Sequence, residues 1–103
     1  MKVMDIRRDS FKDEVEEFKG TVLIDFFAPW CSPCKTMARV IESVAEVADE
    51  NVKVCKVNVD EESELANRFG IMTIPTLVVM KNGEIVNRSI GVTGKRTVFD
   101  MLN

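Results

Sequence analysis

The chain has 103 residues, of which 46% are hydrophobic and 30% charged, and it carries a formal net charge of -3 without any histidine. This composition indicates a single soluble globular domain over residues 1–103 and provides no basic face for nucleic acid. The lack of histidine excludes a histidine base or metal ligand. The segment Met1–Arg8 has no apolar leader core, and no apolar stretch is long enough to span a membrane. We therefore expect a cytoplasmic, monomeric protein that binds neither membranes nor nucleic acid.

The first predicted elements are a strand over 3–6 and a helix that Asp9 and Ser10 would cap. The apolar positions that give this helix one buried face are Phe11, Val15 and Phe18. Gly20 stands where the end of a helix favours a left-handed residue.

A buried strand is predicted over 22–27, and Asp25 lies inside it. Burying a lone carboxylate is costly unless it is paired, hydrogen-bonded or protonated, so this residue needs an explanation. One possibility is an aspartate near the strand end that reaches solvent or caps a turn. The other is a proton-transfer group whose pKa is raised by burial.

Two cysteines, Cys31 and Cys34, stand where the apolar strand gives way to helical spacing. The apolar stripe of that helix comprises Met37, Val40, Ile41, Val44 and Ala48. Residues three apart on a helix have Cβ atoms roughly 5 to 6 Å apart, which allows a disulfide to close and to open. A helix N-terminus lowers the pKa of a thiol, so we predict Cys31 as the attacking thiolate and Cys34 as the resolving thiol. Pro33 suits the first helical turn and stiffens the link between the cysteines.

The next strand is predicted over 52–60, and because its valines occur at both parities it should be a central parallel strand. Lys56 is unusual in that setting, and it either extends its charged end to solvent or has a functional role. Cys55 is predicted to be a small buried hydrophobic residue rather than a redox partner. A short helix over 61–69 follows, and Gly70 should end it.

A hairpin is predicted near the end of the chain. Asn82-Gly83 is the typical sequence of a type I′ turn and would join strands over 76–81 and 84–90. Pro75 precedes the first of these strands, where a proline is typical of a loop or strand edge.

The closing helix has Thr93 as a possible cap, and its inward positions are Val98, Phe99 and Leu102. The alternation of strands and helices along the chain predicts an α/β fold. Helical connections between the early strands imply parallel pairing, and the hairpin adds an antiparallel edge. We therefore predict a central mixed sheet of five strands with helices on both faces.

Three motifs together resemble one known family. Trp-Cys-Ser-Pro-Cys-Lys at 30–35 follows a strand that contains aspartate, Gly-Ile-Met-Thr-Ile-Pro-Thr occupies 70–76, and Lys-Asn-Gly occupies 81–83. With these motifs in this order over essentially the whole chain, the sequence resembles the thioredoxin family. The resemblance implies the thioredoxin fold, a central five-stranded mixed sheet flanked by four helices.

The resemblance implies a catalytic set of Cys31, Cys34, Asp25 and Lys56. Asp25 would lie beneath the Cys31–Cys34 disulfide and exchange a proton with Cys34. Lys56 would approach Asp25 and tune it.

The resemblance also implies a substrate-contacting surface. Pro75 would follow a cis peptide bond and pack against the disulfide, which leaves the backbone of Thr73 and Ile74 free to pair with an extended substrate. Gly91 would allow close approach of the substrate, although a turn glycine explains this residue equally well. Trp30 could be a core aromatic, but beside a helix tip it more plausibly forms an apolar docking surface. The residues of this surface would be Trp30, Ser32, Pro33, Thr73, Ile74, Pro75 and Gly91.

The function implied by the resemblance is a general dithiol-disulfide oxidoreductase, a protein-disulfide reductase that acts on disulfide-containing partner proteins. A flavin-dependent thioredoxin reductase would recycle it. No cofactor is expected beyond the Cys31–Cys34 disulfide, since no GxGxxG motif for a flavin or nicotinamide is present. Ser32 replaces the glycine usual in the family and Phe27 stands where a second tryptophan is common, so the reduction potential and the preferred reductase stay open.

Two other classes of function compete with this interpretation. A structural zinc site needs four ligands, and beyond the motif only Cys55 remains. A redox-silent scaffold is the other alternative, because a fold does not dictate a function. The joint presence of Asp25, both motif cysteines and Pro75 argues against a scaffold.

Overall fold

The computed structural model describes residues 3–103. Met1 and Lys2, at the start of the segment for which no leader is expected, lie outside the described residues. In chain order the elements are β1 (Met4–Asp5), α1 (Arg8–Phe11), the π-helix η1 (Lys12–Glu16), β2 (Thr21–Phe27), α2 (Ser32–Val47), β3 (Val52–Asn58), α3 (Ser63–Arg68), β4 (Thr76–Lys81), β5 (Glu84–Ile90) and α4 (Lys95–Met101).

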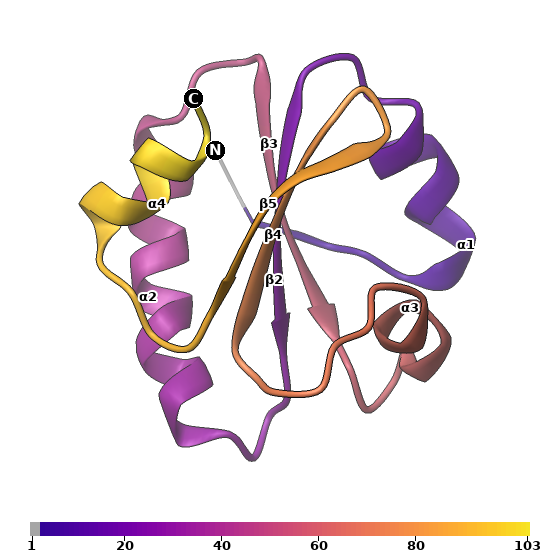
Figure 1. Cartoon of the computed structure of the whole chain (residues 1–103), viewed down its shortest axis with the longest axis vertical. Helices are drawn as coiled ribbons and strands as arrows, with labels where there is room; N and C mark the ends of the chain where they lie inside the picture. Colours follow the sequence, from indigo (N-terminus) through magenta and orange to yellow (C-terminus); the bar gives the residue numbers. More distant parts are fainter. Residues whose placement is uncertain (1–2) are drawn as a thin grey trace.

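The five strands form one mixed sheet in the order β1-β3-β2-β4-β5, which confirms the predicted architecture. β3 is parallel to both β1 and β2, while β4 is antiparallel to β2 and to β5. The register places Asp25 of β2 directly opposite Lys56 of β3. Figure 1 shows α2 and α4 on one side of the sheet and α1 and α3 on the other.

The central strands β2, β3 and β4 are buried on both faces of the sheet, as expected for strands with apolar residues at both parities, whereas the edge strands β1 and β5 are largely exposed. Side chains alternate along β2, so Leu23 packs with the apolar stripe of α2 while Ile24 and Phe26 pack beneath α1 and α3. The residues of α2 that are fully or nearly fully buried against the sheet are Met37, Ile41, Val44 and Ala45. Because α2 packs against the sheet along this stripe, the N-terminus of α2 is held at the carboxyl end of β2.

The amino-terminal helix differs from the prediction. It begins at Arg8 with Arg7 as the N-cap, rather than at a cap formed by Asp9 and Ser10. Ser10 lies inside the helix, where its hydroxyl accepts the Arg7 backbone N–H at 3.1 Å and so satisfies a group that the helix start leaves unpaired. The preceding strand is also shorter than 3–6, since β1 comprises Met4 and Asp5, although the backbone N–H of Ile6 still donates to the Lys56 carbonyl at 2.9 Å.

Gly20 does not act as a left-handed helix cap. Its φ of 144° lies outside the left-handed helical region, and a Cβ atom there would stand 2.5 Å from the backbone oxygen of Asn51. The glycine is therefore required by close packing of two chain segments. Gly70, with φ of 67°, does end its helix in the predicted left-handed conformation.

The later elements agree with the prediction except at their ends. Asn82 and Gly83 have positive φ values of 52° and 82°, as a type I′ turn requires. Thr93 is not the cap of α4, because Gly94 is the N-cap and its carbonyl accepts the Val98 N–H. Within residues 3–103, no helix combines the length and the apolar character needed to cross a membrane.

The sequence predicts a strand over 52–60 followed directly by a helix over 61–69, but both elements are shorter in the structure. β3 stops at Asn58, where the side chain accepts the backbone N–H of Asp60 and turns the chain. α3 begins at Ser63 and ends at Arg68, with Phe69 as its C-cap. Residues 59–62 therefore form a loop rather than the ends of two elements.

Candidate active site

The disulfide lies at the junction of β2 and α2. Cys31 is the N-cap of α2 rather than a residue of its first turn, and Cys34 lies inside that turn. Their Cα atoms are 5.2 Å apart, within the range a disulfide requires, and their sulfur atoms are bonded. The backbone N–H of Cys34 donates to Cys31 Sγ at 3.2 Å. A sulfur in this position receives a hydrogen bond from the helix start and would be stabilised as a thiolate after reduction.

Access to the two cysteines differs only slightly. Cys31 is 5% exposed and Cys34 is 2% exposed, so the predicted attacking cysteine is the more accessible one by a small margin. Ser32 and Pro33 are both exposed at the helix tip, and Pro33 lies in the first turn as predicted. Cys31 therefore lies next to the exposed tip of α2.

Asp25 is buried in the middle of its strand and 2% exposed, which rules out a solvent-exposed or turn-capping aspartate. Its Oδ1 atom has no hydrogen-bond partner among residues 3–103. Burial raises the pKa of this carboxyl to about 7, and the positive charge of Lys56 opposes part of that rise. Asp25 shares with Leu23 the face of β2 that α2 covers, so the carboxyl lies on the same side of the sheet as the helix that carries the cysteines.

Lys56 is exposed although it belongs to a central strand. Its ammonium lies 5.9 Å from the centre of the Phe27 ring, and the register sets the residue opposite Asp25. The charged end of Lys56 therefore reaches solvent, and its positive charge favours the ionised form of the Asp25 carboxyl.

The Ile74–Pro75 bond is cis, as the resemblance implies. Ile74 packs against the small buried cluster that Ala28 and the two cysteines form. The carbonyl of Pro75 accepts the backbone N–H of Gly91 at 2.8 Å, which joins the cis-proline loop to the segment after β5.

Gly91 has φ of 90°, and no atom lies within 4 Å of the position a Cβ would occupy. Its backbone conformation alone explains the glycine, as for a turn residue. The open space around it is also compatible with an approaching substrate. Thr73 is exposed on the neighbouring loop, and its carbonyl accepts the hydroxyl of Thr76.

Trp30 is not a core aromatic, since 71% of it is exposed. Its indole N–H donates to Asp60 Oδ2 at 2.9 Å. Asp60 is a residue that the sequence did not indicate, because it pairs with a partner 30 residues away. Met72, within the motif at 70–76, is 96% exposed. The sequence did not indicate it as a surface residue of the predicted substrate loop.

Cys55 is fully buried in the cluster beneath α1 and α3, which confirms its prediction as a hydrophobic core residue. Burial raises the pKa of its thiol to about 12, so it is inert near neutral pH. Over residues 3–103 no group of three or more side chains could hold a metal ion.

The similar proteins described here are all thioredoxins. The thioredoxin family model matches residues 2–103. The chain is 41% identical to thioredoxin of Bacillus subtilis over 103 residues, covering 100% of this chain and 97% of the relative. It is 43% identical to thioredoxin 1 of Synechococcus elongatus over 94 residues, covering 91% and 88% of the two chains. A solved mutant thioredoxin from Halobacterium salinarum has a TM-score of 0.89 and 32% identity, with coverage of 98% of this chain and 88% of that one.

Proposed function

Because the chain belongs to the thioredoxin family of thiol-disulfide oxidoreductases, we propose that it is a general reductant of disulfides in other proteins. The observation that carries this proposal is the Cys31–Cys34 disulfide at the start of α2, with a backbone N–H directed at Cys31 Sγ. That geometry favours the thiolate of the residue that must attack. The same sulfur is then within reach of Cys34.

The proposed reaction has two exchange steps. In the first, the Cys31 thiolate attacks one sulfur of the partner's disulfide, a mixed disulfide forms, and the other partner sulfur leaves as a thiolate. In the second, Cys34 attacks Cys31 Sγ, the mixed disulfide breaks, and the second partner sulfur is released. Two electrons have passed to the partner, and the protein is left with its own disulfide.

Asp25 is proposed to accept the proton of Cys34 before the second step. Its pKa of about 7 allows it both to take up and to give back a proton near neutral pH. Lys56 is proposed to limit how far that pKa rises, since its positive charge favours the ionised carboxyl. Both roles rest on the burial of Asp25 and on the register between β2 and β3.

The proposed docking surface surrounds Cys31. It contains the exposed indole of Trp30, the helix tip with Ser32 and Pro33, and the backbone of the cis-proline loop. The remaining members are Thr73, Ile74, Pro75 and Gly91. Other apolar side chains exposed on or next to the same loops are Met72, Ile90 and Val92. An extended, partly apolar segment of a partner protein is the substrate that such a surface would accept.

We also propose that a thioredoxin reductase returns the protein to its dithiol form, and that the protein acts as a monomer in the cytoplasm without a bound cofactor. A disulfide that must open and close in each cycle fits a reducing compartment, where structural disulfides are rare. The electrons then come from another protein.

Trapping of partner proteins tests this function. Cys34→Ser removes the resolving thiol, so mixed disulfides on Cys31 should accumulate in a cell extract and be released by dithiothreitol. Cys31→Ser is the matched control and should capture nothing through a disulfide. A Cys34→Ser protein that captures no more than this control would contradict a protein-disulfide reductase.

The reduction potential tests the direction of electron flow. Thioredoxins have a known potential of about -270 mV, whereas the strong oxidant DsbA has about -120 mV. By resemblance we expect this protein near the thioredoxin value, measured by equilibration with a glutathione or dithiothreitol series and read by Trp30 fluorescence. A value close to that of DsbA would mean that Ser32 has changed the chemistry and that the proposed direction is wrong.

A further inference from the structure

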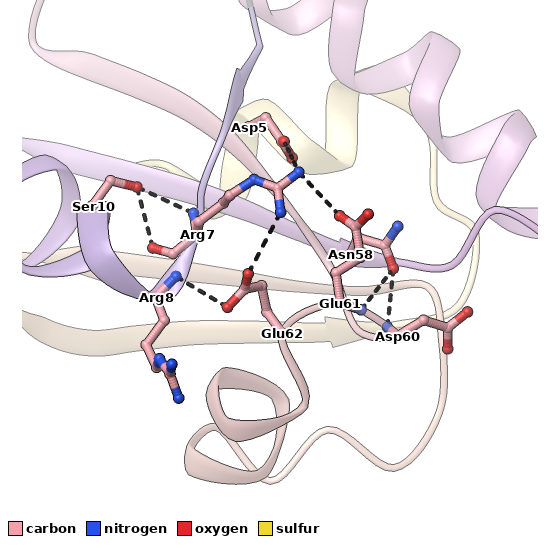
Figure 2. A network of polar contacts seen from close by, with 8 residues as sticks. All are labelled: Asp5, Arg7, Arg8, Ser10, Asn58, Asp60, Glu61 and Glu62. Carbon is pink, nitrogen blue, oxygen red and sulfur yellow. Dashed lines mark hydrogen bonds and ion pairs between the residues drawn. The ribbon is translucent and has the colours of Figure 1, made fainter.

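A polar network outside the disulfide site joins the start of α1 to the loop after β3 (Figure 2). We call residues 58–62, the last residue of β3 and the loop that follows it, the acidic loop, because they include Asp60, Glu61 and Glu62. The loop is closed by its own bonds. Asn58 Oδ1 accepts the backbone N–H groups of Asp60 at 2.9 Å and of Glu61 at 3.4 Å. These bonds hold the backbone of Asp60 and that of Glu61 to the same Asn58 side chain.

Arg7 contacts the acidic loop from the side of α1. Its guanidinium nitrogens lie 3.3 Å from Glu61 Oε1 and 3.9 Å from Glu62 Oε2. A third carboxylate, that of Asp5, lies 3.8 Å away. The backbone of Arg7 is itself held, because its N–H donates to the hydroxyl of Ser10. The backbone of Arg7 is thus hydrogen-bonded to α1 while its side chain contacts the acidic loop.

Glu62 is the most shielded carboxylate of the network. Its side chain is 13% exposed, and its Oε1 accepts the backbone N–H of Arg8 at 3.0 Å. Its backbone N–H donates to the Asn58 carbonyl at 2.9 Å. A carboxylate that is hydrogen-bonded and partly buried holds its position better than a fully exposed one. The loop is consequently fastened to the start of α1 by both backbone and side-chain contacts.

The Asp60 side chain points away from Arg7 (Figure 2) and accepts the indole N–H of Trp30. We infer that Arg7 is a positioning residue for the docking of protein substrates, because it holds the acidic loop and thereby the Asp60 carboxylate that orients Trp30. This inference rests on the proposed function, in which Trp30 belongs to the docking surface. Trp30 is 71% exposed, so little packing is available to orient it without Asp60.

Replacing the arginine tests the inference. Arg7→Ala should raise the KM for a protein disulfide such as that of insulin by about two- to fivefold, the factor that corresponds to an exposed ion pair. The kcat should be unchanged, because the ion pairs of the Arg7 side chain are with carboxylates and not with Cys31 or Cys34. The chain has a single tryptophan, so the fluorescence anisotropy of the reduced protein reports on Trp30 alone and should fall.

Arg68→Ala is the matched control. The Arg68 side chain is 56% exposed and that of Arg7 is 53% exposed. Arg68 also forms an ion pair between two elements, because its guanidinium on α3 lies 2.7 Å from the Glu16 carboxylate on η1. It has no contact with the acidic loop among the ion pairs of residues 3–103. We expect this variant to lose stability without any change in KM or in Trp30 anisotropy. Equal KM and equal anisotropy in the two arginine variants would overturn the inference.

A double-mutant cycle shows whether the effect passes through Asp60. Asp60→Ala should raise KM and lower Trp30 anisotropy at least as much as Arg7→Ala does. In the Asp60→Ala background, Arg7→Ala should have no further effect on either quantity. A full additional effect in that background would contradict a route through Asp60. If the unchanged protein reduced no insulin, the proposed function would be wrong, whereas anisotropy unaffected by Arg7→Ala would refute the positioning role alone.

Discussion

Replacement of the buried carboxyl by Asp25→Asn should stabilise the oxidised protein increasingly as the pH rises. Burial raises the pKa of Asp25 from 3.8 to about 7, so the folded protein binds this proton more tightly than the unfolded chain does. The full stability is therefore present below about pH 4 and is lost as the pH rises through the folded pKa. A difference of about three pH units at about 1.36 kcal/mol each makes the ionised carboxyl cost roughly 4 kcal/mol above neutrality.

Urea unfolding followed by Trp30 fluorescence measures this effect. Between about pH 5 and about pH 8, the difference in unfolding free energy between Asp25→Asn and the unchanged protein should grow by roughly 2 to 3 kcal/mol in favour of the variant. Any cost of burying the amide is the same at both pH values and cancels from this change. Asp100→Asn, which removes an exposed carboxyl on α4, is the control for the loss of a carboxyl group as such. The same free-energy difference for Asp25→Asn at both pH values would refute the buried, high-pKa carboxyl.

Two glycines and the third cysteine give further predictions. Gly20→Ala should destabilise the protein by roughly 2 to 3 kcal/mol, because its Cβ would clash with the Asn51 carbonyl, whereas Gly70→Ala, which meets open space, should cost only about 1 kcal/mol of left-handed strain. Urea midpoints of the two variants check this order, and an equal loss would contradict the role of close packing at Gly20. Cys55 should resist iodoacetamide in the folded, reduced protein while Cys31 reacts, since burial raises the Cys55 pKa to about 12. Mass spectrometry of the peptides would contradict this if both cysteines were labelled at similar rates before unfolding.

Features that depend on neighbours along the chain could be predicted from the amino-acid sequence alone. The spacing of Cys31 and Cys34 and the apolar stripe after them predict a cysteine pair at a helix start, because both follow from the helical repeat. Asn82-Gly83 predicts its hairpin because both residues tolerate positive φ. A lone carboxylate in an apolar strand likewise marks Asp25 as exceptional. The cis bond before Pro75 followed only from the resemblance, since local preference favours the trans form.

Contacts between residues that are distant in the sequence depend on the tertiary structure. The strand order β1-β3-β2-β4-β5 brings Lys56 opposite Asp25, and the sequence order of the strands does not contain that information. The parallel pairing of β2 with β3 brings Asp60 to Trp30 across 30 residues, and the pairing of β1 with β3 brings the acidic loop to Arg7. Such contacts have no local signature, because a polar residue in a loop has the same sequence preference with or without a partner. Packing of the sheet brings these residues together, and the packing depends on the whole chain at once.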